Sequence, residues 1–140
     1  MPKKKQKNHQ LRLFLETAAV SCQDEVFNFD LTSQDIVPKY SRKNGLLYEN
    51  DCIDILIRIP SGSIDMIFAD PPYNIKKADW DKFESQEQYI AWSMKWISEC
   101  SRILKENGSL FICGFTEVLA DLKHPSMRYF KYCKWLIWHY

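Results

Sequence analysis

The segment "IDMIFADPPYNI", residues 64–75, joins an apolar run to an acid, two prolines and a tyrosine. Residues 64–69 are apolar at nearly every position, which is typical of a parallel strand covered on both faces. Neither Pro71 nor Pro72 has an N–H group to donate to a sheet, and a residue before a proline stays extended. The sequence therefore predicts a buried strand that ends at Asp70, where the chain leaves the sheet.

The segments on both sides alternate between strand and helix patterns. Strands are predicted at 46–50, 109–113 and 133–139, and helices at 52–59, from Ser85 to Asn107-Gly108 and at 116–123. This alternation predicts an α/β fold, a doubly wound, Rossmann-like sheet of mainly parallel strands with flanking helices. Because a strand at 133–139 would leave apolar surface bare, we expect an incomplete domain or one that needs a partner chain.

The N-terminal part differs in composition from the rest. Residues 1–43 are predicted to form a basic tail and an irregular extension with a short helix at 11–20, and residues 44–140 the folded domain. Four lysines fall within the first seven residues. Such polar sequence buries too little to offset its ordering entropy, so we expect a mobile tail up to Gln10. Contact of the tail with nucleic-acid phosphates is the open alternative.

Composition narrows the class of protein. The chain has 140 residues, a formal net charge of +1 and five cysteines without a CxxC pair. An odd number of scattered cysteines indicates neither a disulfide framework nor a zinc site, and no metal site is predicted. No apolar run approaches the roughly 20 residues of a membrane span, and the residues after Met1 lack the apolar core of a signal peptide. We therefore expect an intracellular, cytoplasmic protein without a membrane partner.

The residues after the strand suggest a chemistry. The Asp70 carboxylate and the carbonyls of Asp70 and Pro71 form a rigid group of hydrogen-bond acceptors beside the ring of Tyr73. Such a group suits a planar ligand with N–H donors, such as the amine of a nucleobase on which Tyr73 can stack. From the residues alone, a proline-stiffened strand exit with a surface acid is an equally good interpretation.

"DPPY" followed by "NI" resembles the catalytic motif of amino-group DNA methyltransferases. The preceding segment 46–75 and the following segment 80–114 resemble the corresponding runs of the beta class, which holds adenine-N6 and cytosine-N4 enzymes. Order and spacing agree over roughly residues 45–140. The resemblance implies that 44–140 is part of a methyltransferase catalytic domain.

The resemblance also implies roles for individual residues. The catalytic motif is Asp70, Pro71, Pro72 and Tyr73: Asp70 and the Pro71 carbonyl accept hydrogen bonds from the target amine, and Tyr73 stacks on an adenine flipped out of duplex DNA. The methyl donor is S-adenosylmethionine, and the displacement needs neither a metal nor a covalent intermediate. Asp51, Cys52 and Asp70 match positions that contact this cofactor, although Asn50 stands where the family usually has a glycine. Trp80 and Phe83 either line the base pocket or pack in the core.

One family feature is missing from the sequence. The family holds the methionine half of the cofactor with an FxGxG loop, whereas the glycines here are isolated, at 45, 62, 108 and 114. We therefore expect the N-terminal portion of an adenine-N6 DNA methyltransferase, without the cofactor loop and the target-recognition region. Alone, it should bind S-adenosylmethionine weakly. Methylation of cytosine N4 or another amino group, an inactive chain that only binds nucleic acid or a partner chain, and a homodimer stay open.

Overall fold

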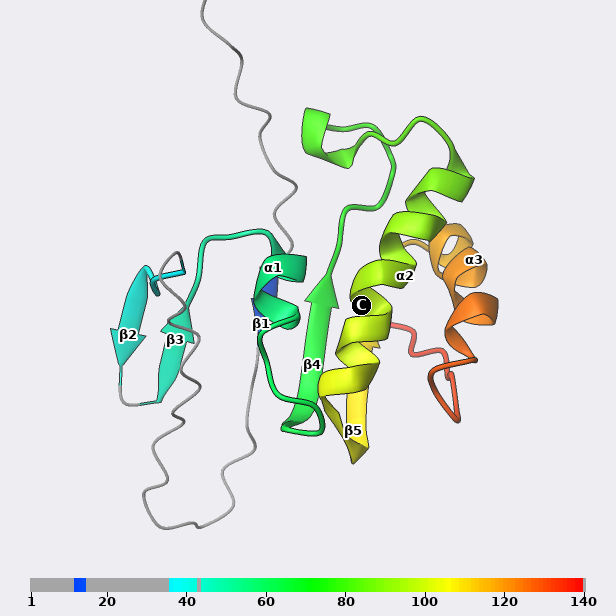
Figure 1. Ribbon diagram of the computed structural model, residues 1–140. Helices are drawn as coiled ribbons and strands as arrows, with labels where there is room; N and C mark the ends of the chain where they lie inside the picture. Colours follow the sequence, from blue (N-terminus) through cyan, green and yellow to red (C-terminus); the bar gives the residue numbers. More distant parts are fainter. Residues whose placement is uncertain (1–11, 15–35, 43, 140) are drawn as a thin grey trace, which may run out of the picture.

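The computed structural model describes residues 12–14, 36–42 and 44–139 (Figure 1). The elements are β1 (Arg12–Phe14), β2 (Tyr40–Arg42), β3 (Gly45–Leu47), α1 (Cys52–Leu56), β4 (Ile64–Asp70), the 3-10 turn η1 (Asp79–Asp81), α2 (Gln86–Ile103), β5 (Leu104–Ile112) and α3 (Thr116–Ser126). One sheet has the order β1-β4-β5, and β2 and β3 form a separate hairpin. The predicted mobile tail up to Gln10 lies outside the described residues.

The centre of the fold is the parallel pair β4 and β5. Ile67 pairs with Leu110, Phe68 with Phe111 and Ala69 with Ile112. The predicted strands 64–69 and 109–113 are therefore confirmed, as is their parallel arrangement. Helix α2 connects them, and its N-terminus has the predicted cap, because the Ser85 hydroxyl accepts from the Gln88 N–H at 3.2 Å.

The predicted end of the long helix at Asn107-Gly108 is wrong. α2 ends at Ile103 and the chain passes directly into β5, where Leu104 is already extended. A side chain at Gly108 would lie 3.1 Å from the backbone oxygen of Asp65 on the neighbouring strand. The glycine therefore permits a close approach of two strands at a register shift, rather than ending a helix.

Two of the predicted parallel strands are absent from this sheet. The segment 46–50 contributes only to β3, which pairs antiparallel with β2. Gly45 lies opposite Arg42 in this pair, and Asn44 lies in the turn. Asparagine is favoured in tight hairpin turns, so the chain folds back on itself instead of entering the larger sheet. The segment 133–139 forms neither strand nor helix, and its side chains from Trp135 to Trp138 are exposed. Apolar composition supplies no hydrogen-bond partner for a strand's backbone, so it does not by itself make a strand.

Near the N-terminus, the helix predicted at 11–20 is wrong for residues 12–14, which form β1. This strand pairs antiparallel with the carboxyl half of β4, Arg12 opposite Asp70. Residues 15–20 lie outside the described part of the chain, as does most of the predicted irregular extension. The described end of that extension contains β2, which was not predicted.

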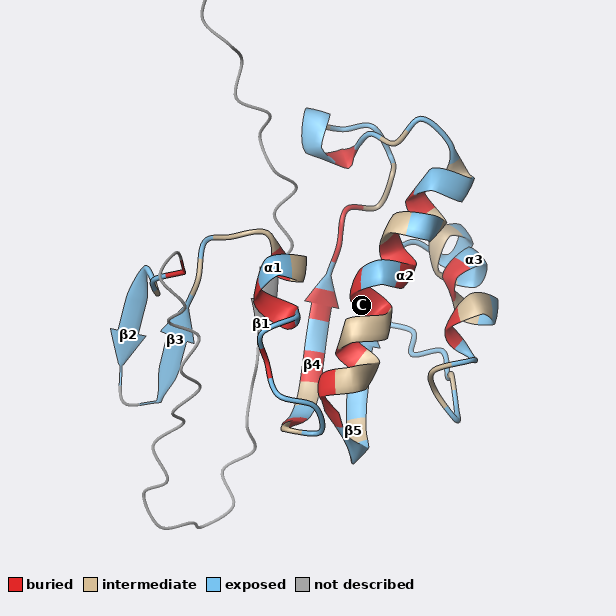
Figure 2. Cartoon of the chain, in the orientation of Figure 1, coloured by how far each residue is buried: buried red, intermediate tan, exposed pale blue. Residues whose placement is uncertain are grey.

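The helices cover one face of the sheet. In Figure 1, α1 lies in front of β1 and α2 in front of β5, and α2 contacts both α1 and α3. Burial alternates along β4 (Figure 2): Ile67 and Ala69 are fully buried, whereas Phe68 is 40% exposed. Its neighbour Phe111 on β5 is 37% exposed. The fold is thus of the α/β class, but the second helical layer of a doubly wound sheet is not present among the described residues, and β4 is buried on one face only.

Candidate active site

The DPPY motif lies where β4 ends, at the carboxyl edge of the parallel pair, as predicted. The Cys113 N–H donates to the Ala69 carbonyl at 2.9 Å and ties the end of β5 to the end of β4. Asp70 is exposed, whereas Pro71 and Pro72 are buried. The rigid proline pair therefore presents one carboxylate to solvent at the position where open α/β sheets bind ligands.

Helix α2 contacts the motif through the side chain of Tyr89. The Tyr89 hydroxyl donates to the Pro72 carbonyl at 2.9 Å in a buried setting. Burial raises the pKa of Tyr89 to about 12, so this hydroxyl keeps its proton. No described residue donates to the Pro71 carbonyl. Of the two proline carbonyls, the second thus anchors the motif, and the first has no donor among the described residues.

The side chain of Tyr73 contacts Asp70, the acid of the same motif. Its hydroxyl donates to the Asp70 carboxylate, and its ring meets the Phe115 ring edge-to-face with centroids 5.4 Å apart. Burial, followed by the hydrogen bond to Asp70, raises the pKa of Tyr73. Burial and the charge of Asp70 also raise the pKa of the Cys113 thiol. The Tyr73 hydroxyl thus occupies the Asp70 carboxylate in this structure.

The two other predicted cofactor residues lie at the start of α1. Asp51 is the N-cap of this helix, and one of its carboxylate oxygens accepts from the Ile53 N–H at 2.8 Å. In Figure 1, α1 begins at the same end of the molecule as the arrowhead of β4. Cys52 is 5% exposed and its side chain belongs to the core. The structure thus leaves the second oxygen of Asp51 without a described partner and keeps the Cys52 thiol away from the surface.

Comparison with known proteins agrees with the motif. A model of the N6/N4 DNA methylase family matches residues 64–140, more than half of the chain. The chain belongs to this family. It is 35% identical over 107 residues to the Type II methyltransferase M.BamHI of Bacillus amyloliquefaciens. The matched region covers 74% of this chain and 25% of that protein. It is 30% identical over 135 residues to the Type II methyltransferase M2.MboI of Moraxella bovis, covering 69% of this chain and 50% of that protein. The chain thus spans a quarter to a half of the length of these relatives.

In this member of the N6/N4 DNA methylase family, the two aromatic residues after the motif have different surroundings. Phe83 packs against Tyr89 and Trp92, with ring centroids 5.0 and 5.2 Å away, and so takes the packing role. Trp80 is 50% exposed in the 3-10 turn. Phe83 therefore supports the residue that anchors Pro72 rather than lining a pocket.

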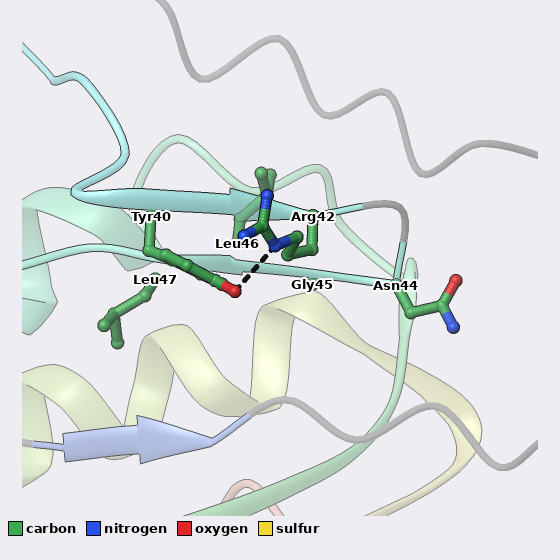
Figure 3. Close-up of a pocket in the computed structure, with 6 residues that line it drawn as sticks. All are labelled: Tyr40, Arg42, Asn44, Gly45, Leu46 and Leu47. Atoms are coloured by element: carbon green, nitrogen blue, oxygen red, sulfur yellow. Dashed lines mark hydrogen bonds between the residues drawn. The ribbon is translucent and has the colours of Figure 1, made fainter.

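A hollow elsewhere on the molecule is unrelated to the motif (Figure 3). It lies on the β2–β3 hairpin and is lined by Tyr40, Arg42, Asn44, Gly45, Leu46 and Leu47. Arg42 donates from Nε to the Tyr40 hydroxyl at 2.7 Å across it. None of the predicted site residues borders this hollow.

The described residues contain neither a membrane-spanning helix nor a metal-binding cluster. No helix within residues 36–42 and 44–139 is long and apolar enough to cross a bilayer. Over the same part of the chain, no three or more His, Cys, Asp or Glu side chains gather so that they could hold a metal ion.

Three residues that shape the site were not predicted: Tyr89, Phe115 and Asp81. Helical spacing placed Tyr89 on the buried face of α2, and a buried tyrosine hydroxyl needs a partner. Phe115 follows β5, and residues that follow adjacent parallel strands meet at the same edge of the sheet. Asp81 is an acid in a loop of mixed polar residues, and no local pattern distinguishes it from its neighbours.

The buried Cys52 and Tyr89 predict how stability depends on pH. Burial raises the pKa of Cys52 from 9.0 to about 12 and that of Tyr89 from 10.0 to about 12. Both groups stay neutral in the folded protein at a pH at which they ionise in the unfolded chain. A raised folded-state pKa contributes stability that is complete below the unfolded pKa and is lost as pH rises through the folded value. We therefore expect the free energy of unfolding to decline between about pH 9 and pH 12.

Urea unfolding at neutral pH and at a pH about 1.5 units above the ordinary thiol pKa measures this decline, of which Cys52 should contribute about 1–2 kcal/mol. Cys52→Val keeps a buried apolar side chain and removes the titrating thiol, so its decline should be smaller. Equal declines in the two proteins would contradict a neutral, buried thiol at this position.

Proposed function

We propose that the protein carrying this sequence transfers a methyl group from S-adenosylmethionine to N6 of adenine in DNA. The observation that supports this most is the exposed Asp70 carboxylate at the end of β4. It is followed by the Pro71 carbonyl, which has no donor among the described residues, and by the Pro72 carbonyl, which Tyr89 anchors. Membership of the N6/N4 family supports an exocyclic amine as the acceptor, and the choice of adenine is the finer part of the proposal.

The two acceptors of the motif act on the target amine. The Asp70 carboxylate and the Pro71 carbonyl each accept one N–H of the amine, which turns the nitrogen lone pair out of conjugation with the ring. The nitrogen is then aimed at the electrophilic carbon, and the step depends on position and preorganised acceptors. Because the Tyr73 hydroxyl donates to Asp70 in this structure, the incoming amine takes the place of that hydroxyl, and the ring of Tyr73 stacks on the flipped base.

S-adenosylmethionine, when bound, supplies the methyl group as an electrophile. Asp51 fits the adenosine part of this cofactor, since one carboxylate oxygen caps α1 and the other has no described partner to compete with a ribose hydroxyl. Cys52 fits less well: its thiol is buried and protonated, so only its backbone is available for contact. Asp70 is exposed at the same end of the molecule. DNA as the partner, a partner chain, a homodimer and a cytoplasmic location remain predictions.

The product identifies the acceptor. The full-length protein that carries this sequence is incubated with S-adenosylmethionine that carries an isotopically labelled methyl group and with duplex DNA of mixed sequence. The DNA is then digested to nucleosides for mass spectrometry. We expect the label in N6-methyldeoxyadenosine. Label in N4-methyldeoxycytidine would replace adenine by cytosine and retain the amino-group chemistry. DNA without label would contradict the proposal.

The ring and the hydroxyl of Tyr73 should have separable effects. Tyr73→Ala removes the stacking surface, which is worth about 1–3 kcal/mol per base, so kcat/KM should fall by roughly 5- to 100-fold. Tyr73→Phe keeps the ring and removes only the hydroxyl that occupies Asp70, so it should retain kcat/KM within about threefold. Kinetics of methyl transfer measure both variants, and a phenylalanine variant as impaired as the alanine variant would show that the hydroxyl, not the ring, serves the reaction.

A further inference from the structure

The loop between the motif and α2 is organised around a buried charge. Asp81 is only 2% exposed, although it lies in a loop. One of its carboxylate oxygens accepts from the Asn74 N–H at 2.6 Å, and the other accepts from the N–H groups of Ile75 at 3.1 Å and Lys77 at 3.5 Å. A carboxylate out of water requires such donors, and here backbone amides supply them.

The same loop contains backbone conformations that need support. Asn74 has φ 56° and Lys76 has φ 59°, both in the left-handed region that residues other than glycine rarely adopt. The donors to Asp81 include Asn74 itself, and the Lys76 N–H donates to the backbone carbonyl of Asp81 at 3.1 Å. The loop is thus held in its strained shape by bonds that converge on Asp81.

A second set of bonds connects the loop to the helices. The Asn74 side chain accepts from the Phe83 N–H at 3.3 Å and donates to Gln86 at 3.0 Å. Gln86, the first residue of α2, donates in turn to the Asp121 carboxylate on α3 at 2.9 Å. Asn74 directly follows Tyr73, so the loop fixes the chain on one side of the catalytic tyrosine while Tyr89 fixes Pro72 on the other.

We propose that Asp81 is a positioning residue that sets the orientation of the Tyr73 ring, and through it the shape of the site for the flipped base. Its carboxylate is buried among loop amides and acts on the site through the backbone of residues 74–77. The kinetic part of this inference rests on the proposed function; the structural part does not.

The test compares Asp81→Asn with Asp79→Asn. The asparagine at 81 puts an NH₂ group where one oxygen accepted from loop amides. Asp79 lies in the same 3-10 turn, but its side chain is fully exposed and pairs with Lys82, so it undergoes the same chemical change at the surface.

Two readouts are independent of activity. In Asp81→Asn, amide exchange at Asn74, Ile75 and Lys77 should accelerate at least about tenfold while Ile67 in the core keeps its protection. The nuclear Overhauser effect between the Tyr73 and Phe115 rings, now 5.4 Å apart, should weaken. Asp79→Asn should leave both unchanged. Unchanged exchange at the three amides, acceleration spread equally to Ile67, or an unchanged ring contact would overturn the inference.

The kinetic readout separates positioning from binding. Asp81→Asn should lower kcat about 10- to 100-fold, since small misplacements in an active site have effects of this size, and should change KM for DNA less than threefold. Faster amide exchange at Asn74, Ile75 and Lys77 together with an unaltered kcat would overturn the positioning role of Asp81. A wild-type protein that transfers no methyl group would contradict the proposed function instead, and the exchange and ring measurements would still decide the role of Asp81.

A second variant covers the case in which Asp81→Asn does not fold. Asp81→Glu keeps the charge and adds one methylene, which moves the carboxylate oxygens away from the N–H groups of Asn74 and Ile75. It should weaken the contact between the Tyr73 and Phe115 rings and lower kcat in the same direction. A ring contact and a kcat equal to those of the wild type would contradict the inference.

Discussion

Replacing Asp70 by alanine is expected to lower the turnover of methyl transfer by about 100- to 1,000-fold or more, the range seen when one preorganised polar group is removed from a reacting centre. The carboxylate accepts from the amine whose nitrogen attacks, so its loss affects the reacting atom. Binding of duplex DNA should change little, because Asp70 acts on the base and not on phosphates.

The matched control is Asp65→Ala. Asp65 is an exposed acid on the same strand as Asp70, and its carboxylate pairs with Lys105 at 2.7 Å. It should keep turnover within about twofold, since exposed ion pairs contribute at most about 1 kcal/mol. Steady-state kinetics and a DNA-binding titration measure both variants. Full activity in Asp70→Ala would remove the catalytic assignment, and equal losses in the two variants would point to folding of the strand rather than chemistry.

Trp96→Ala is expected to have the largest effect on stability, a loss of about 3–5 kcal/mol in the free energy of unfolding. Trp96 is fully buried on the inner face of α2, and its ring lies 6.4 Å from that of Trp92. Its indole N–H has no hydrogen-bond partner among the residues that the structure describes, so the expected loss comes from packing and from the cavity left behind. A loss of this size approaches the whole stability of a small domain.

The comparison residue for this substitution is Trp138. It is 85% exposed, and Trp138→Ala should change the free energy of unfolding by less than about 0.5 kcal/mol. Urea denaturation followed by far-UV circular dichroism measures both proteins. If the two substitutions cost the same, the core would not be centred on α2, or the segment 133–139 would be packed against something in solution.

The parts of the fold that the sequence predicted are those governed by local rules. Helix α2 followed from a capping residue, Ser85, and from apolar spacing of three and four. The strand at 64–69 and its parallel partner at 109–113 followed from short apolar runs joined by that helix. Because the two prolines after Asp70 cannot donate to a neighbouring strand, the chain had to leave the sheet there. This placed the motif at the carboxyl edge of the sheet.

The parts that the sequence did not predict depend on contacts between distant residues. Apolar content alone did not determine whether the segments 46–50 and 133–139 would pair with an edge strand of the sheet. In the structure neither segment joins the sheet β1-β4-β5. A glycine such as Gly108 is common at the end of a helix. Its role here is set instead by the close approach of the Asp65 backbone, 43 positions earlier in the chain. The bonds from the 74–77 loop to Asp81 and from Tyr89 to Pro72 likewise become visible only when the chain is folded.

The most direct test of the account is to find which residue touches the target base. Once the methylated adenine is known, a duplex with 5-iodouracil in its place is bound to the protein and irradiated, and the cross-linked peptide is identified by mass spectrometry. The account predicts a cross-link to Tyr73, since this ring is placed to stack on the flipped base. A cross-link confined to residues away from the end of β4, such as the β2–β3 hairpin, would contradict it.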